Sequence, residues 1–279
     1  MSSIKSKGLV LKETKVGEYD KRVTLLLKET GKVTAYSKGA RKATSKFLTG
    51  TQLFSYSEYV LFSTNRFLST SHIEIIDNFY NIRTDYDKLC YGTYFLELTD
   101  KVVLENLQVD DILYLLLRTL HILNRKTPIS RENSPNQENQ DEGINIKLIC
   151  AVFNFKFLKL NGYEPILSNC FACQKEIFHK DIFQNETKDN YYFSSDGLVC
   201  GKCKQKNHYI EVSYSTVYSI NYILSSSIND IYKFNLQEGY VDELYQASFL
   251  FLRSHLDVNL KSLDMMPTNY SDKLTKKQN

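Results

Sequence analysis

The sequence predicts an α+β multidomain protein, in which an N-terminal β-barrel precedes an α-helical domain with an inserted four-cysteine module. Three observations predict this fold. Apolar and polar residues alternate over residues 4–77, and apolar residues recur every three or four positions over much of the chain after residue 78. Four cysteines form two C-x2-C pairs. A chain of 279 residues can bury more than one hydrophobic core.

The expected domain boundaries follow from these changes of pattern. We expect the barrel over residues 1–78, the helical domain over 79–164 and 209–262, the cysteine module over 165–208 and a flexible tail over 263–279. A polar stretch at 124–143 is interpreted as a flexible insertion between helices. Neither a transmembrane span nor a signal peptide is recognisable, so we expect a cytoplasmic protein without a membrane partner.

Strands are predicted at residues 8–14, 22–28, 32–37, 52–62 and 66–76. The turn clusters Gly17–Asp20 and Glu29–Gly31 separate the first three strands, and a basic loop over 38–49 precedes the fourth. Five strands in about 75 residues fit a small closed or partly open barrel. We assign Tyr56, Tyr59 and Phe62 to its core, with platforms for stacked bases as the alternative.

Helices are predicted over residues 79–94, 96–104, 112–123, 144–160, 215–226 and 241–256. Cys90 and Cys150 lie within these apolar patterns, and we expect both thiols to be buried and inert.

The remaining cysteines predict one structural zinc ion. Cys170 and Cys173 form the first C-x2-C pair, and Cys200 and Cys203 form the second. Four thiolates fill the tetrahedral coordination of zinc and leave no open position for a substrate. Disulfides or unrelated thiols are the alternative, and His179 or His208 could replace one cysteine. Gly201 is expected to ease the second turn by adopting a positive φ angle.

Tyr191–Ser194, followed by the turn pair Asp196-Gly197, predicts a hairpin strand between the two cysteine pairs. This order of elements is typical of a zinc ribbon.

A basic segment joins two of the predicted barrel strands. Residues 31–50 contain several cations and neither Asp nor Glu. Such a run predicts attraction to the phosphates of a nucleic acid, although a merely solvated loop is the alternative. Flanking aromatic residues could stack on unpaired bases. The predicted nucleic-acid-binding residues are Lys38, Arg41, Lys42, Lys46, Arg22, Arg66, Tyr36 and Phe47.

Catalytic signatures are absent from the sequence, which contains neither a phosphate-binding loop nor a G-x-S-x-G motif. We therefore expect a protein that is not an enzyme. Two alternatives stay open: a zinc-containing nucleic-acid-processing enzyme, and an RNA-binding accessory protein. Against the first alternative, the cysteines of this sequence are not part of the H-x-E and P-C-x-x-C signature of zinc deaminases.

The sequence resembles the bacterial recombination mediator family RecO. The resemblance covers most of the chain and is most specific at Gly8–Leu11, Gly17–Leu26 and Thr30–Lys42, and it continues through Leu158–Pro165. It implies that the barrel is an OB-fold and that a zinc module is inserted in the helical domain. The insertion at 124–143 and the extended tail depart from the family pattern.

The resemblance also implies a function in DNA repair and homologous recombination. A member of the family would bind single- and double-stranded DNA, anneal complementary strands and, with RecR, help RecA to load onto DNA coated by SSB, at the nucleoid. We expect the helical domain to receive the acidic C-terminal tail of SSB. Lys156 and Lys159 lie three residues apart on one predicted helix and are the candidate contacts.

Overall fold

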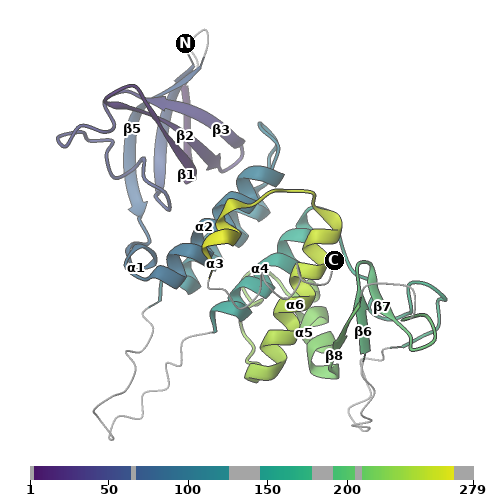
Figure 1. Ribbon diagram of the computed structural model, residues 1–279. Coiled ribbons are helices and arrows are strands. Elements are labelled where there is room, and N and C mark those ends of the chain that lie inside the picture. The colour runs from purple at the N-terminus through teal and green to yellow at the C-terminus, as the bar shows by residue number, and fades with distance from the viewer. Residues whose placement is uncertain (1–2, 64–66, 126–144, 178–190, 205–208, 267–279) are drawn as a thin grey trace, which may run out of the picture. The chain divides into compact units, whose positions relative to one another are not determined.

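The computed structural model describes residues 3–63, 67–125, 145–177, 191–204 and 209–266 (Figure 1). The chain divides into two compact units, one made of residues 1–126 and 258–279 and the other of residues 127–257. The expected insertion at 124–143, apart from its first two residues, and most of the expected tail at 263–279 lie outside the described residues. Within the described part of the chain, no helix has both the length and the apolar character that crossing a membrane requires.

The first unit contains a closed five-stranded barrel, as the sequence predicts. Its strands are β1 (Ser3–Val16), β2 (Asp20–Leu27), β3 (Gly31–Ser37), β4 (Tyr56–Ser63) and β5 (Leu68–Asp77). They are ordered β1-β2-β3-β5-β4, and β4 closes the barrel by pairing with β1. The pairing of β3 with β5 is parallel and all other pairings are antiparallel, which is the arrangement of an OB-fold.

The fourth strand starts later than predicted, at Tyr56 instead of residue 52. Phe54 has a φ of 66°, a left-handed conformation that lies outside the range of a regular β-strand. Phe54 is nevertheless buried, with 1% of its surface exposed. The segment before β4 therefore contributes an apolar side chain to the core from a turn.

Alternate residues of the strands fill the barrel, because successive side chains of a strand point to opposite faces. The buried core cluster is Val10, Val23, Leu25, Leu27, Val33, Ala35, Tyr59 and Leu61. The assignment of Phe62 to the core is wrong. Phe62 follows the inward-facing Leu61, so it points outward, and 42% of its surface is exposed. Tyr56 is half-buried and only Tyr59 is fully buried.

Three helices and a final 3₁₀ turn complete the first unit: α1 (Tyr80–Arg83), α2 (Tyr86–Val102), α3 (Asp110–Leu123) and η2 (Lys261–Met265). The helices predicted at 79–94 and 96–104 are thus largely one helix, α2, which begins where the Asp85 side chain accepts a hydrogen bond from the backbone of Lys88. The Lys32 ammonium on β3 donates to the carbonyl of Asp100 on α2 at 2.6 Å and so fastens helix to barrel.

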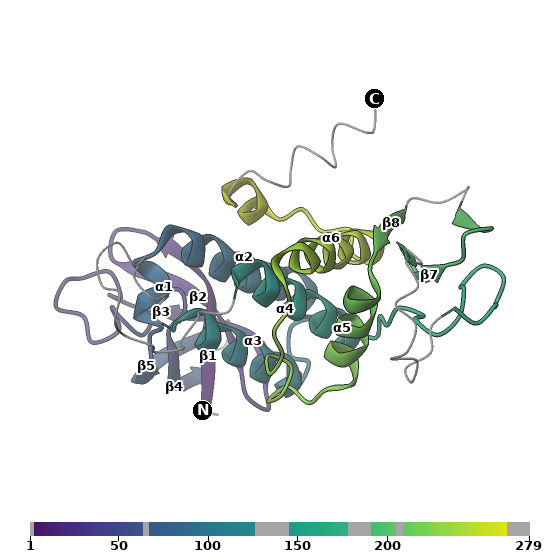
Figure 2. The ribbon, with the colours of Figure 1, turned by 90° about the horizontal axis from the view of Figure 1, so that it is seen from below.

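In its described residues, the second unit combines three α-helices with a small sheet: α4 (Ile146–Leu160), α5 (Tyr214–Ser225) and α6 (Glu238–His255), with β6 (Tyr191–Ser194), β7 (Gly197–Val199) and β8 (Tyr209–Val212). The sheet order is β7-β6-β8 (Figure 1), and Figure 2 shows β8 next to α6. Phe155 of α4 stacks on Phe251 of α6 at 6.0 Å between ring centroids, and Phe193 of β6 meets the same ring of Phe155 at 6.1 Å. The sheet therefore shares one apolar core with the helices.

Candidate metal centre and nucleic-acid interface

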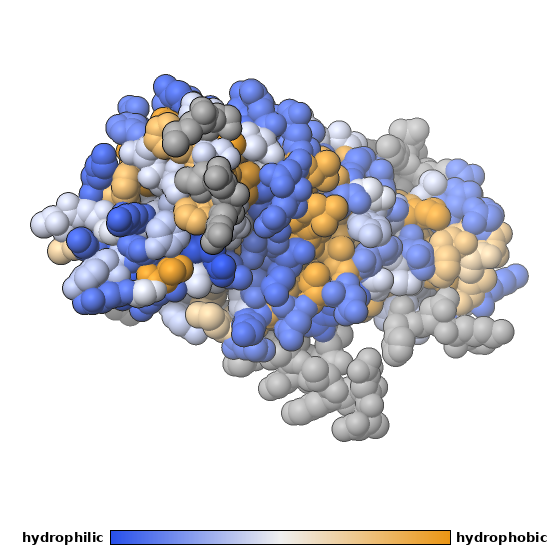
Figure 3. All heavy atoms as spheres, turned by 90° about the horizontal axis from the view of Figure 1, so that it is seen from above, coloured by the Kyte–Doolittle hydropathy of each residue, from blue (hydrophilic) through white to orange (hydrophobic). Residues whose placement is uncertain are grey.

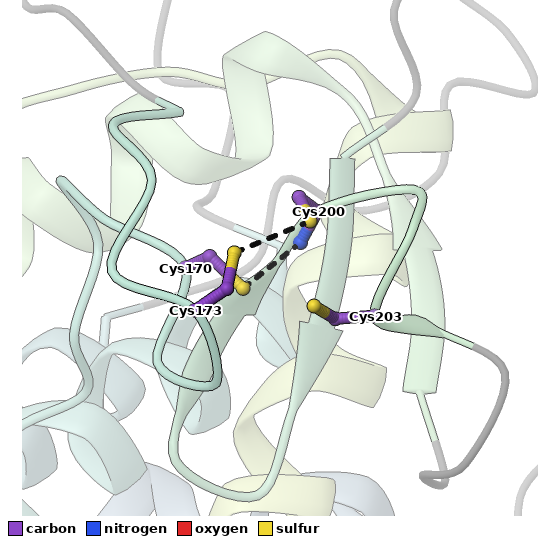
Figure 4. Close-up of side chains that lie close together, drawn as sticks. All are labelled: Cys170, Cys173, Cys200 and Cys203. Atoms are coloured by element: carbon purple, nitrogen blue, oxygen red, sulfur yellow. Dashed lines mark hydrogen bonds between the residues drawn. The ribbon is translucent and has the colours of Figure 1, made fainter.

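The four predicted cysteine ligands lie together in the second unit (Figure 4). Their sulfur atoms all lie within 4.8 Å of one another. The sulfurs of Cys173 and Cys200 are 3.7 Å apart. Zinc–sulfur bonds of about 2.3 Å in a tetrahedron place two sulfurs roughly 3.8 Å apart. All four are free thiols and not disulfides, so the cluster has the size and donor set of a site for a thiophilic metal ion.

Two short turns bring these sulfurs together. In the first, the backbone N–H of Cys170 donates to Lys175 at 2.8 Å, and that of Gln174 donates back to Cys170 at 2.8 Å. In the second, the backbone N–H of Cys203 donates to the carbonyl of Cys200 at 2.9 Å. The expectation of a positive φ at Gly201 is wrong, because the residue with the left-handed conformation is Gln174, with a φ of 62°.

A glycine fixes how the first cysteine turn joins the sheet. Gly197 begins β7 with a φ of 134°, and a Cβ atom there would lie 2.1 Å from the carbonyl oxygen of Ile166. The backbone N–H of Ile166 donates to Asp196 at 3.0 Å, and that of Leu198 donates to Ile166 at 2.8 Å. The segment leading to Cys170 is therefore hydrogen-bonded alongside the hairpin. The predicted hairpin around Asp196-Gly197 is confirmed.

The thiols differ in their affinity for protons. Burial raises the pKa of Cys170, but N–H groups of Cys200, Cys173 and Ala172 outweigh that effect and lower the pKa to about 6. Hydrogen bonds with the thiols of Cys200 and Cys173 raise the pKa of Cys203 to about 12. Four thiolates in so small a volume repel one another, and a divalent cation removes that penalty. The donor set of the cluster is thus suited to a divalent metal ion.

The predicted cationic segment forms a loop between β3 and β4 in the first unit. Lys38, Lys42 and Lys46 are exposed, and no salt bridge to them is present in the described part of the chain. The surface at the left of Figure 3, where the barrel lies, is mostly hydrophilic. Arg22 is exposed on β2, whereas Arg66 lies outside the described residues. The barrel thus presents three exposed loop ammonium groups together with a guanidinium group.

Arg41 differs from the three loop lysines because its side chain is engaged. Its guanidinium donates to the carbonyls of Gly17 at 3.1 Å and Glu18 at 2.8 Å, and its backbone N–H donates to Tyr19 at 2.8 Å. These bonds attach the loop to the turn between β1 and β2. Arg41 therefore shapes the loop as well as adding charge to it.

Asp20 is a functional candidate that the sequence analysis treated only as a turn residue. Its carboxylate accepts hydrogen bonds from the backbone N–H of Gly39, at 2.7 Å, and from the hydroxyl of Tyr36. The bond from Gly39, followed by that from Tyr36, lowers the pKa of Asp20. Hydrogen bonds to an anion are stronger than those between neutral groups, so this carboxylate fixes the start of the cationic loop.

The two aromatic residues predicted to stack on bases are both half-buried. The ring of Tyr36 lies 5.7 Å from that of Phe67, which the sequence analysis did not single out and which is 52% exposed. The ammonium group of Lys46 lies 5.2 Å from the ring centroid of Phe47. Tyr36 therefore belongs to an aromatic pair on the barrel, and Phe47 belongs to the loop.

The two lysines expected to meet a partner have different surroundings in the second unit. Lys156 is only 6% exposed, and its ammonium donates to the last carbonyls of α5, the shortest contact being 2.5 Å to Ser226. Lys159 pairs with Glu164 at 2.7 Å and keeps a third of its side-chain surface exposed. Phe155 and Leu158, their neighbours on α4, are fully buried. Of the two cations, Lys159 is the more accessible.

Comparison with known proteins gives consistent matches over nearly the whole chain. Models described as Recombination protein O N terminal and Recombination protein O C terminal match residues 1–79 and 138–264. The DNA repair protein RecO of Acetivibrio thermocellus is 31% identical over 271 residues, which are 96% of this chain and 98% of that protein. The DNA repair proteins RecO of Alkaliphilus metalliredigens and Caldicellulosiruptor saccharolyticus are 30% and 28% identical, over 94% and 95% of this chain and 98% of each relative.

Proposed function

Because the chain belongs to the RecO family of DNA repair proteins, we propose that it is a non-enzymatic recombination mediator that binds single- and double-stranded DNA and anneals complementary strands. Together with RecR it helps RecA to load onto DNA coated by SSB. The observation that carries the proposal is the loop of exposed lysines on a closed barrel. Exposed lysines bind DNA phosphates independently of the base sequence. Such binding suits a repair protein, which acts on DNA of any sequence.

Transfer of a DNA single strand from SSB to RecA requires no nucleotide hydrolysis by the mediator. A single strand can pass from one protein to another when one set of phosphate contacts replaces another, because each contact is weak and reversible. Lys38, Lys42 and Lys46 supply such contacts on the barrel. We place the protein in the cytoplasm, at the nucleoid.

We assign one structural zinc ion to the cysteine cluster. Cys170, Cys173, Cys200 and Cys203 together would close its coordination sphere, so the ion would hold two chain segments together and have no position free for catalysis. The fit of the sulfur–sulfur distance to tetrahedral zinc supports this assignment.

The tail of SSB is assigned to the helices of the second unit. Such a tail is acidic and apolar, and grooves between helices rimmed by cations suit it. Lys159 is the better candidate contact, because the ammonium group of Lys156 is already bound to α5. RecR and RecA are assigned no contact residues.

Binding of labelled single-stranded DNA, duplex DNA and RNA of the same sequence, measured on protein whose metal content is known, tests the proposal. A DNA-binding mediator should bind both DNA forms, accelerate annealing of complementary strands and contain close to one zinc ion per chain. Preference for RNA over both DNA forms would favour an accessory protein of RNA metabolism. Cleavage or deamination of any of the three would identify an enzyme.

A further inference from the structure

The connection between α2 and α3 lies against the turn that joins β2 to β3. Lys32 and Glu105 are neighbours in a parallel bridge, and the backbone N–H of Asn106 donates to the carbonyl of Lys32 at 3.0 Å. A Cβ atom on Gly31 would lie 2.0 Å from the carbonyl oxygen of Leu107, so the two backbones are in direct contact. The connection is therefore fixed to the barrel by its backbone.

This fixed connection exposes two leucines. Leu104 is 69% exposed and Leu107 is 52% exposed. Asn106, between them, has a φ of 58°, a left-handed conformation that Asn adopts more readily than most residues. A single exposed leucine is ordinary on a protein surface. Two leucines on a backbone that is hydrogen-bonded in place form an apolar surface that belongs to the fold.

Tyr114 of α3 lies beside the same turn and is 48% exposed. Asp110, four residues earlier on the same face of the helix, accepts the backbone N–H of Glu29 at 2.7 Å and attaches the start of α3 to the turn. An electrostatic interaction with Tyr114, followed by the hydrogen bond to Glu29, raises the pKa of Lys28, the first residue of that turn. The tyrosine and the two leucines are thus carried by segments that are all attached to the β2–β3 turn. We call these three side chains the α2–α3 surface: Leu104, Leu107 and Tyr114.

Carboxylates outnumber ammonium groups around the α2–α3 surface. Residues 28–32 and 100–114 contain five carboxylates and three ammonium groups, namely Glu29, Asp100, Glu105, Asp110 and Asp111 against Lys28, Lys32 and Lys101. Two of the ammonium groups are already paired, one with Glu29 at 3.5 Å and the other with Asp100 at 3.8 Å. The surroundings of the surface are therefore negative.

The exposed carboxylates distinguish this surface from the cationic loop. Glu105 and Asp111 are exposed, and no salt bridge to either is present among the described residues. The loop lies at the other end of β2 and β3, and the eight residues of β2 separate the two ends by roughly 23 Å. Like charges repel, so the α2–α3 surface repels the phosphates that the loop attracts. It suits neither a nucleic acid nor an anionic lipid surface.

We propose that the α2–α3 surface binds a partner protein through a segment that carries both apolar and basic side chains. Burial of the leucines and the tyrosine provides affinity, and Glu105 and Asp111 favour a cationic segment over an acidic one. A symmetric contact between two copies of this chain would bring the same carboxylates together, so a second copy fits the surface less well than a basic partner. The inference goes beyond the proposed function, because a partner at this surface leaves the cationic loop free to hold DNA.

Three labelled peptides of equal length serve as probes for such a segment. The first combines Leu and Lys with helical periodicity, the second has Glu in place of Lys, and the third has Ser in place of Leu. Fluorescence anisotropy with the full-length protein measures the three affinities. The Leu/Lys peptide should bind at least about 10-fold more tightly than either of the others, because it alone matches both the apolar side chains and the charge of the surface.

Two double variants locate the binding site. Leu104→Ser combined with Leu107→Ser should weaken binding of the Leu/Lys peptide at least about 5-fold, because apolar contact area is lost. Glu105→Lys combined with Asp111→Lys should weaken binding of the same peptide and strengthen binding of the Leu/Glu peptide. Loss of folding cannot produce such a reversal of preference, so the charge variant decides the question even if the leucine variant is destabilised.

Matched controls change the same kinds of residue elsewhere in the chain. Ile75→Ser combined with Ile76→Ser removes two aliphatic side chains that are 46% and 48% exposed on β5. Glu238→Lys combined with Asp257→Lys reverses two exposed carboxylates of the second unit. Neither control should reproduce the effects of the variants in the α2–α3 surface.

Equal affinities of the wild-type protein for the three peptides, or unchanged Leu/Lys binding in both double variants, would overturn the inference. Sedimentation velocity tests the other occupant: self-association that the leucine variant abolishes would assign the surface to a second copy of the chain and overturn the choice of a basic partner. Weaker binding of single-stranded DNA by the leucine variant would overturn it as well, by making the surface part of the nucleic-acid interface. The loop lysines remain in every variant, so the proposed function is tested separately by replacing them.

Discussion

The carboxylate of Asp20 accepts the backbone N–H of Gly39 at 2.7 Å. Gly39 has a φ of 67°, so the chain turns sharply at that point and the loop begins in a direction that Asp20 fixes. Tyr36 donates its hydroxyl to the same carboxylate. One acidic side chain thus connects the aromatic pair of Tyr36 and Phe67 with the loop that bears the lysines.

Asp20→Asn should lower the urea midpoint of unfolding at neutral pH, because a neutral amide is a weaker acceptor than a carboxylate. The folded-state pKa of Asp20 is lowered, so its stabilising contribution is present above the ordinary carboxyl pKa near 3.8 and is lost as the pH falls through the folded value. The two proteins should therefore converge in acid. A difference that stays constant from neutral pH to acid would contradict this assignment.

Replacing Lys38, Lys42 and Lys46 together by Ala should weaken binding to single-stranded DNA and reduce its salt dependence. Each neutralised phosphate contributes a slope of about 0.7, so the variant should lose roughly two units. Lys233→Ala in the second unit, which removes an ammonium paired with Asp230, is the control and should leave the slope unchanged. An unchanged slope in the triple variant would place the phosphate contacts elsewhere.

Zinc removal should destabilise the second unit. A chelator, or Cys200→Ser, should lower the thermal midpoint and reduce the zinc content from about one ion per chain. Acid should release the metal as well, because protons compete for the thiolates. Cys90→Ser removes a buried thiol of the first unit and should leave the zinc content unchanged. A fully folded protein without metal, with four reactive thiols, would refute the assignment.

Gly197→Ala should destabilise the cysteine module by about 2 kcal/mol or more, because a Cβ atom would clash with Ile166 and the φ angle disfavours L-residues. Gly201→Ala is the matched control. Its Cβ would meet nothing closer than Tyr192 at 3.9 Å, and its backbone has no positive φ. Urea unfolding of both variants checks the difference. Equal destabilisation of the two variants would show that the close approach of Gly197 to Ile166 does not hold the first cysteine turn against the hairpin.

Lys156→Met should destabilise the second unit by about 1–3 kcal/mol, because the carbonyls at the end of α5 would lose a buried charged donor. Lys159→Met removes only a partly exposed pair with Glu164 and should cost about 0–1 kcal/mol. Calorimetric unfolding distinguishes them. If both variants unfolded like the wild type, Lys156 would be free to meet a partner.

The alternation of apolar residues predicted all five strands of the barrel. The cysteine spacing predicted a cluster of four thiols that the structure confirms. The ring contact between Tyr36 and Phe67 could not be predicted in this way. It depends on the parallel pairing of β3 with β5, which joins residues 35–36 to residues 68–69 and forms only when the barrel closes. Phe62 was misassigned because residues 56, 59 and 62 are three positions apart, so the regular alternation of β4 cannot place all three on the inner face.

The contacts of Lys156 could not be predicted from the sequence either. Its spacing from Lys159 describes one helix, whereas the carbonyls that bind it belong to α5, about seventy positions later in the chain. Gln174 illustrates the same point for backbone angles. Glycine is the usual residue at a positive φ, so the sequence pointed to Gly201, yet hydrogen bonds of the first cysteine turn hold Gln174 in that conformation.

The first unit is built from two segments of the chain, one that precedes the second unit in the sequence and one that follows it. Glu97 on α2 accepts the backbone N–H groups of Lys261, at 3.1 Å, and Ser262, at 2.8 Å, and so fastens η2 to the helices beside the barrel. During synthesis, the ribosome must release residues 127–257 before this clasp can form. The helices beside the barrel therefore lack this contact until the half with the cysteine cluster has been synthesised, and a chain that ends within that half cannot form it.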